Sequence, residues 1–219
     1  DIVIEVSSPE VAEAAKIFEN TFRQVNIALV NEFAQIANAL GISGREVLDA
    51  AATKPYGFMP FRPGVGVGGH CIPVDPLYLT WWARQSGQQA MFVESADVIN
   101  HAMPKYVAQR TLMLVDSLIP NPRVLILGVA YKPGVGDVRE TPVSDLYHHL
   151  QDLGAIVAWH DPYVKTWEDT EPVGLDWNCD IAILATNQPG MDAEQLIAKG
   201  VQILDCTNSL RNKPGVISL

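Results

Sequence analysis

The chain has 219 residues, 48% of them hydrophobic and 18% charged, which is ordinary for a globular protein with one large or two small packed domains. Its formal net charge of −10 argues against a nucleic-acid partner, because such partners require a basic face that neutralises phosphates. No apolar run approaches the roughly 20 residues that span a bilayer and no signal peptide is recognisable, so we expect no membrane partner and a cytoplasmic location.

The long segment from Ser8 to Leu40 predicts one helix, with a hydroxyl side chain to cap it and Pro9 at its first position. At 1.5 Å per residue it is about 50 Å long. Too little of the remaining chain is left to cover its apolar stripe, so we expect a homodimer through this helix. The stripe recurs in steps of three and four until Gly41 and consists of Val11, Ala15, Phe18, Phe22, Val25, Leu29, Phe33, Ile36 and Leu40.

A second helix is predicted near residues 43–53, and the segment RPGVGVGGHCIPVDP (62–76) follows it with the spacing G-x-G-x-x-G. A dinucleotide fingerprint needs a strand before the glycines and a helix after them. Prolines interrupt the preceding segment, and Pro73 and Pro76 argue against a helix directly after it. We therefore expect a glycine-rich loop that exposes Cys71 as a nucleophile.

The other two cysteines, Cys179 and Cys206, lie beside strand-like runs and are expected to be small buried hydrophobic side chains. None of the three has C-x-x-C spacing, so we predict free thiols and neither a disulfide framework nor a metal site.

The pattern changes after residue 119, where short β-rich runs begin to alternate with amphipathic segments. This alternation predicts βαβ units and a parallel sheet buried on both faces. The expected fold is α/β: a helical dimerisation domain over 1–119, built on the one long helix, and a small doubly wound, Rossmann-like domain over 120–219. The predicted strands lie within 123–131, 155–162, 180–187 and 201–206, and the predicted helices within 141–154 and 193–200.

Two sets of polar residues are candidates for a site. Lys16 and Asn20 lie one turn apart on one face of the long helix, and apolar neighbours favour partial burial of Lys16. Lys132 and Arg139 flank a glycine-containing loop after the first strand of the sheet. Ligands of such sheets bind beyond the carboxyl ends of the strands, so this loop favours anion binding.

Three stretches, AKIFENTFRQVNIALVNE, FRPGVGVGGHCIPVDP and VLILGVAYKPGVGDVRETP, resemble in this order the central and C-terminal parts of the UDP-glucose/GDP-mannose dehydrogenase family. The resemblance spans essentially the whole chain. The motif GGHCIP-DP is most similar to that of the branch of the family that acts on UDP-N-acetylhexosamines. Family members begin with an NAD-binding Rossmann domain, which nothing in this chain resembles. We therefore expect a fragment of a longer enzyme, inactive alone.

The resemblance implies an NAD-dependent oxidation of the C6 alcohol of a UDP-sugar to a carboxylate, in two hydride transfers. Cys71 would form a thioester, Lys16 and Asn20 would stabilise oxyanions, and Asp75 would position the hydrolytic water or tune Lys16. The glycines would let the backbone approach the nucleotide sugar. The implied cofactor contacts are Val74 and Arg139, and the implied substrate contacts are Pro60, Phe61, Arg62, Pro63, Gly64, Gly68 and Lys132.

Two alternatives remain open from the sequence. In the first, the reaction is the same but its substrate is UDP-glucose or GDP-mannose instead of a UDP-N-acetylhexosamine. In the second, the polypeptide is a nucleotide-sugar-binding and dimerisation module without turnover. The set Lys16, Asn20, Cys71 and Asp75 favours an enzyme as the parent protein.

Overall fold

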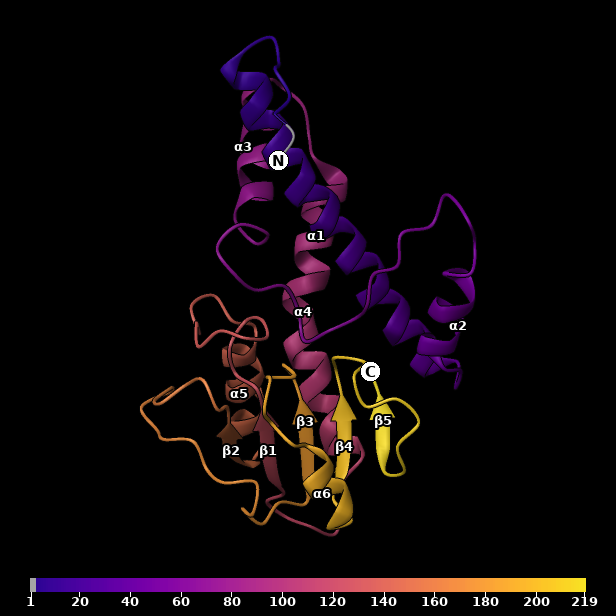
Figure 1. Ribbon diagram of the computed structural model, residues 1–219, viewed down its shortest axis with the longest axis vertical. Coiled ribbons are helices and arrows are strands. Elements are labelled where there is room, and N and C mark those ends of the chain that lie inside the picture. Colours follow the sequence, from indigo (N-terminus) through magenta and orange to yellow (C-terminus); the bar gives the residue numbers. More distant parts are fainter. Residues whose placement is uncertain (1–2) are drawn as a thin grey trace.

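The computed structural model describes residues 3–219 and has the expected α/β fold, with a helical part followed by a five-stranded parallel sheet (Figure 1). Its elements in chain order are α1 (Pro9–Ala39), α2 (Gly44–Ala51), α3 (Asp75–Gln85), α4 (Met91–Met113), β1 (Arg123–Leu127), α5 (Val143–Asp152), β2 (Ile156–His160), β3 (Ile181–Leu184), α6 (Glu194–Ala198), β4 (Gln202–Asp205) and β5 (Val216–Ser218).

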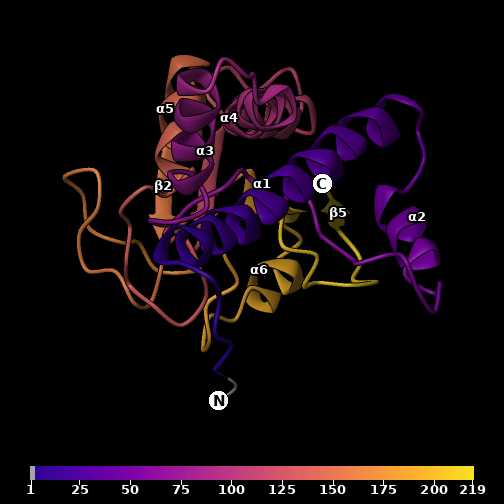
Figure 2. The same cartoon turned by 90° about the horizontal axis from the view of Figure 1, so that it is seen from above.

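The sheet has the strand order β2-β1-β3-β4-β5, and every neighbouring pair is parallel. Helices α4 and α5 cover one face and α6 lies on the other, so the sheet is doubly wound as predicted (Figure 2). Along β1, Val124 and Ile126 pack toward α4 and α5, whereas Leu125 and Leu127 join the cluster on the α6 side. Strand β5, whose three residues are only half-buried, was not predicted from the sequence.

Helix α1 begins and ends almost where its caps predict. The Ser8 hydroxyl accepts the Val11 N–H, and the helix ends one residue before the C-cap Leu40. Gly41 then adopts φ +67°, a left-handed conformation that glycine adopts without strain.

Helix α3 begins at Asp75, close to the start of the helical pattern that the sequence shows from Pro76 onward. Pro76 occupies the first turn of α3, where its missing N–H would have no helical partner in any case. The segment before the glycines contains no strand in the described structure, so the strand-loop-helix arrangement of a dinucleotide fingerprint is not formed.

The face that α1 buries is largely polar or small, while its apolar stripe faces outward. Asn20, Gln24 and Asn31 are each at most 1% exposed. Lys16 was expected to be partly buried, but its side chain is 58% exposed because its turn of α1 has little of the chain packed over it. Seven stripe residues are exposed, namely Val11, Ala15, Phe18, Phe22, Leu29, Ile36 and Leu40.

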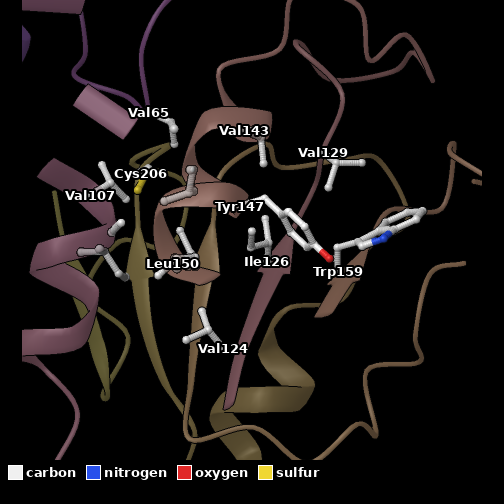
Figure 3. Packing of buried hydrophobic residues seen from close by; sticks show 14 of the residues in the cluster. Val65, Val107, Val124, Ile126, Val129, Val143, Tyr147, Leu150, Trp159 and Cys206 are labelled. Atoms are coloured by element: carbon white, nitrogen blue, oxygen red, sulfur yellow. The ribbon is translucent and has the colours of Figure 1, made fainter. Parts of the chain in front are cut away.

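The glycine-rich segment is anchored in the core of the sheet by Val65. This side chain is 4% exposed and belongs to the hydrophobic cluster that includes Val107 of α4 and Ile126 of β1. Figure 3 shows Val65 above the sheet, near Val107 and Cys206. Burial at this position fixes the start of the loop that carries Cys71.

Candidate functional site

Cys71 lies in the turn that leads into α3. Its backbone carbonyl accepts the N–H of Val74 at 3.2 Å and that of Asp75 at 2.8 Å, so the turn and the first residue of the helix are tied together. Cys71 is exposed, whereas the other two cysteines are buried as expected, and all three are free. Burial raises the pKa of the Cys179 and Cys206 thiols, and the accessible thiol among the three is that of Cys71.

Asp75 connects this turn to α1. Its Oδ2 accepts a hydrogen bond of 2.5 Å from the Nδ2 of Asn20, which is fully buried. The Asn20 Oδ1 in turn accepts from the guanidinium of Arg23, which also pairs with Glu19 at 3.0 Å. The structure therefore brings together Asn20, Asp75 and the Cys71 turn. Arg23 was missed in the sequence, although its i+3 spacing from Asn20 places it on the same face.

Lys16 lies one helical turn before Asn20, but its ammonium group pairs with another residue. The distance from its Nζ to Glu19 Oε2 is 2.8 Å, and both side chains are more than half exposed. Exposed pairs of this kind contribute little stability, so the lysine can turn toward a ligand at small cost. No contact in the described part of the chain tests the predicted role of Lys16 in stabilising oxyanions, so this role stays a prediction.

The glycines beside Cys71 serve a contact within the chain. A Cβ on Gly68 would lie 2.8 Å from Pro142 Cδ and 2.9 Å from the Glu140 carbonyl oxygen, and one on Gly69 would lie 2.9 Å from the Tyr131 ring. The Gly69 N–H also donates to the Glu140 carbonyl at 3.3 Å. Gly68 and Gly69 therefore admit residues 131–142 of the chain itself, and their contact with a nucleotide sugar stays a prediction.

The 131–142 segment follows β1 and carries both predicted cations of the sheet half. Arg139 donates from Nε and Nη2 to the two carboxylate oxygens of Asp137, at 3.0 and 2.8 Å, and holds the pKa of that carboxyl well below its usual range. His70, next to Cys71, has its Nε2 3.8 Å from Asp137 Oδ2. Lys132 is exposed, with its Nζ 5.2 Å from the centroid of the Tyr131 ring.

The predicted substrate loop, residues 60–64, lies along α1. The Phe61 ring meets the Phe22 ring edge-on with centroids 5.9 Å apart, and the Gly64 N–H donates to Asn31 Oδ1 at 2.9 Å. Arg62 pairs with Asp49 of α2. Pro60 is exposed and Pro63 is half-buried, as is Val74, the N-cap residue of α3.

Two further findings concern residues 3–219. No group of three or more histidine, cysteine, aspartate or glutamate side chains is arranged there to hold a metal ion. None of the helices described is long and apolar enough to cross a membrane.

The chain is similar in sequence to two curated UDP-sugar dehydrogenases. The chain is 42% identical over 172 residues to UDP-N-acetyl-D-glucosamine 6-dehydrogenase of Pseudomonas aeruginosa, covering 77% of this chain and 40% of that protein. It is 39% identical over 164 residues to UDP-N-acetyl-D-mannosamine dehydrogenase of Methanococcus aeolicus, covering 74% of this chain and 36% of that protein. The chain therefore spans about two fifths of the curated relatives that it matches.

Solved structures match over nearly the full chain. A UDP-glucose dehydrogenase of Pyrobaculum islandicum has a TM-score of 0.81 at 26% identity and covers all of this chain, which spans 52% of that structure. The UDP-N-acetyl-mannosamine dehydrogenase Cap5O of Staphylococcus aureus has a TM-score of 0.80 at 28% identity, covering 96% of this chain and 51% of that structure.

Two models of a single family match this chain. The model of the family's central domain matches residues 10–102, and the model of its UDP-binding domain matches residues 125–212. Together they cover most of the sequence, and the chain belongs to the UDP-glucose/GDP-mannose dehydrogenase family.

Proposed function

We propose that the protein containing this chain oxidises the C6 alcohol of a UDP-N-acetylhexosamine to a carboxylate through a thioester on Cys71. The observation that carries the proposal is the connection of the exposed Cys71 turn to Asp75 and of Asp75 to the buried Asn20. The substrate class is supported by the names of the relatives, which act on UDP-N-acetyl-D-glucosamine and UDP-N-acetyl-D-mannosamine.

Each member of this set has a chemical role in the proposal. The Cys71 thiolate adds to the C6 aldehyde and gives a thiohemiacetal. Loss of the second hydride from C6 to the acceptor, with the proton of its hydroxyl group, gives the thioester, which water cleaves to the carboxylate and the free thiol. The Asp75 carboxylate, held by the Asn20 amide, orients that water. Lys16, once it leaves Glu19, neutralises the oxyanion that forms at C6. Lys132 and the 60–64 loop contact the nucleotide sugar.

NAD, when bound, supplies the acceptor for the two hydrides. The Arg139 side chain fits the negative charge of a dinucleotide, because it is 73% exposed and Asp137 engages only its Nε and Nη2. Asp137 also holds the guanidinium close to His70 and hence to the Cys71 loop. Arg139 and Val74 would therefore line the cofactor side of the site. The remainder of the NAD site would belong to a part of the protein outside this chain.

We further propose that the protein is a homodimer through α1, located in the cytoplasm. The exposed stripe recurs at residues 11, 15, 18, 22, 29, 36 and 40, along almost the full length of the helix. A continuous apolar stripe of this kind is typical of a helix that packs against a partner. Free thiols suit a reducing compartment.

The dimer is tested by Leu29→Glu, since Leu29 is 61% exposed in the centre of the stripe. We expect sedimentation at the mass of one chain for this variant and of two chains for the parent. Asn38→Glu adds the same charge to α1 on the opposite side from the stripe and should leave the dimer intact. A parent chain that sediments as a monomer at high concentration would contradict the proposal.

The reaction is tested in the full-length protein with Cys71→Ser. We expect NADH formation from UDP-N-acetylhexosamines to fall by several orders of magnitude, because serine is a poor nucleophile at neutral pH and an oxygen ester resists a site built for a thioester. Cys179→Ser and Cys206→Ser are matched controls, expected to change stability by about 1–3 kcal/mol and leave the mechanism intact. Turnover of Cys71→Ser near the parental rate would refute the covalent role.

The same assay decides between the alternative substrates. Faster oxidation of UDP-glucose or GDP-mannose than of the UDP-N-acetylhexosamines would show that the protein has the substrate specificity of another branch of the family. Binding of these compounds without any turnover by the full-length protein would favour the non-catalytic module.

A further inference from the structure

Cys71 follows two glycines in the chain, Gly68 and Gly69, and glycine has the most conformational freedom of all residues. Residues 52–74 lie between α2 and α3, outside any helix or strand. The chain after Cys71 is fixed by the turn into α3, where the Cys71 carbonyl accepts two N–H groups. The position of the thiol therefore also depends on what packs against the glycines before it.

The ring of Tyr131 packs against these glycines. A Cβ on Gly69 would lie 2.9 Å from Cε2 and 3.0 Å from Cδ2 of this ring, and a Cβ on Gly68 would lie 3.1 Å from Tyr131 Cβ. The ring thus approaches the Gly69 backbone more closely than a side chain at this position would permit. The ring of His70, the residue directly before Cys71, has its centroid 6.2 Å from that of Tyr131.

The backbone that leads into Tyr131 is held by buried polar groups at the end of β1. The N–H groups of Val129 and Ala130 donate to Asp161 Oδ2, at 2.9 and 3.2 Å, and Asp161 is 1% exposed. The Ala130 carbonyl accepts the hydroxyl of Thr186 at 2.7 Å. A buried polar network whose members are paired is rigid, so the ring of Tyr131 is a fixed surface for the Cys71 loop.

We propose that Tyr131 is a positioning residue, which holds the Cys71 thiol at the reacting carbon of the nucleotide sugar. The inference rests on the proposed function, in which this thiol is the nucleophile. Lys132, a proposed contact of the nucleotide sugar, follows Tyr131 in the chain, and its Nζ lies 5.2 Å from the ring centroid. One segment of the sheet half therefore places both the nucleophile and a group that binds the substrate. A displacement of reacting groups by about 1 Å lowers rates by up to about 100-fold.

The test compares Tyr131→Ala with Tyr131→Phe in the full-length protein. NADH formation is measured with UDP-N-acetyl-D-glucosamine or UDP-N-acetyl-D-mannosamine, whichever the parent oxidises faster. We expect Tyr131→Ala to lower kcat by about 10–100-fold and to change the KM of the nucleotide sugar by less than about threefold, because the ring places the thiol and does not bind the substrate. Tyr131→Phe keeps the ring atoms that face Gly69 and should retain at least about half of the parental kcat.

Amide hydrogen exchange of a peptide that spans residues 66–75 is the second measurement, made without nucleotide sugar or NAD. We expect this peptide to exchange at least about tenfold faster in Tyr131→Ala than in the parent, and at the parental rate in Tyr131→Phe. A parent protein without turnover would refute the proposed function, whereas the exchange rates would still show whether Tyr131 holds the Cys71 loop. If the alanine variant does not fold, Tyr131→Leu replaces it with the same expectations, since leucine keeps apolar volume but lacks the flat ring.

Tyr163→Ala is the matched control, because it removes the same side chain from a loop at the same edge of the sheet. Tyr163 is 44% exposed, and alanine keeps the Cβ that lies near Gly136. We expect its kcat and the exchange of the 66–75 peptide to stay within about twofold of the parent. Parental kcat or parental exchange in Tyr131→Ala would overturn the proposal. Equal losses in Tyr163→Ala, or in Tyr131→Phe, would overturn it as well.

Discussion

Gly68→Ala tests whether the Cys71 loop depends on its contact with residues 131–142. The added methyl group would lie 2.8 Å from Pro142 Cδ, 2.9 Å from the Glu140 carbonyl oxygen and 3.1 Å from Tyr131 Cβ. Two of these neighbours are a proline ring and a backbone oxygen, which cannot turn away as a flexible side chain can. The loop itself must therefore move.

The magnitude follows from two contributions. Overpacking of this kind costs about 1–3 kcal/mol. Displacement of the loop also breaks the hydrogen bond from the Gly69 N–H to the Glu140 carbonyl, worth about 1 kcal/mol. We therefore expect Gly68→Ala to lower the free energy of unfolding by about 2–4 kcal/mol.

Urea unfolding followed by the fluorescence of the five tryptophans measures this change. Gly64→Ala is the control in the same loop, because its Cβ would meet only the Cys206 carbonyl oxygen, at an ordinary 3.8 Å. It should change the free energy of unfolding by less than about 1 kcal/mol in either direction. Equal stability of Gly68→Ala and the parent chain would refute the assignment of this glycine to a contact within the chain.

Two further predictions concern polar contacts. Asn31→Leu should lower the free energy of unfolding by about 2–5 kcal/mol, because it leaves the buried Asn100 Oδ1 and the half-buried Gly64 N–H without their partner. The exposed Asn38→Leu on the same helix should be nearly neutral in urea unfolding. The pKa of Asp137 is lower in the folded than in the unfolded chain, so its pair with Arg139 should stabilise the fold fully above the ordinary value of 3.8 and progressively less as the pH falls below it. Urea midpoints of Asp137→Asn should therefore lie below those of the parent at pH 6 and approach them toward pH 3, and a difference that is the same at both pH values would contradict this linkage.

Most of the local structure of this protein follows from patterns in its sequence. Ser8, Pro9 and Gly41 mark the ends of α1, and continuous apolar runs mark β1, β3 and β4, because caps and periodicity act between residues close together in the chain. The short and half-buried β5 carries no such pattern and was missed. The candidate residues lie in short motifs, and these motifs are local patterns too. The resemblance to one family could therefore be read from the sequence.

Which of these residues contact each other depends on how the helices and strands pack together. Asn20 and Asp75 are 55 residues apart, and their hydrogen bond exists because α1 and α3 pack together. The same packing left Lys16 exposed beside Glu19. The residues that require Gly68 to be a glycine lie more than 60 positions away in the chain, so no local pattern could identify them. Such contacts depend on how whole elements bury their faces against each other, and this packing is a property of the assembled fold.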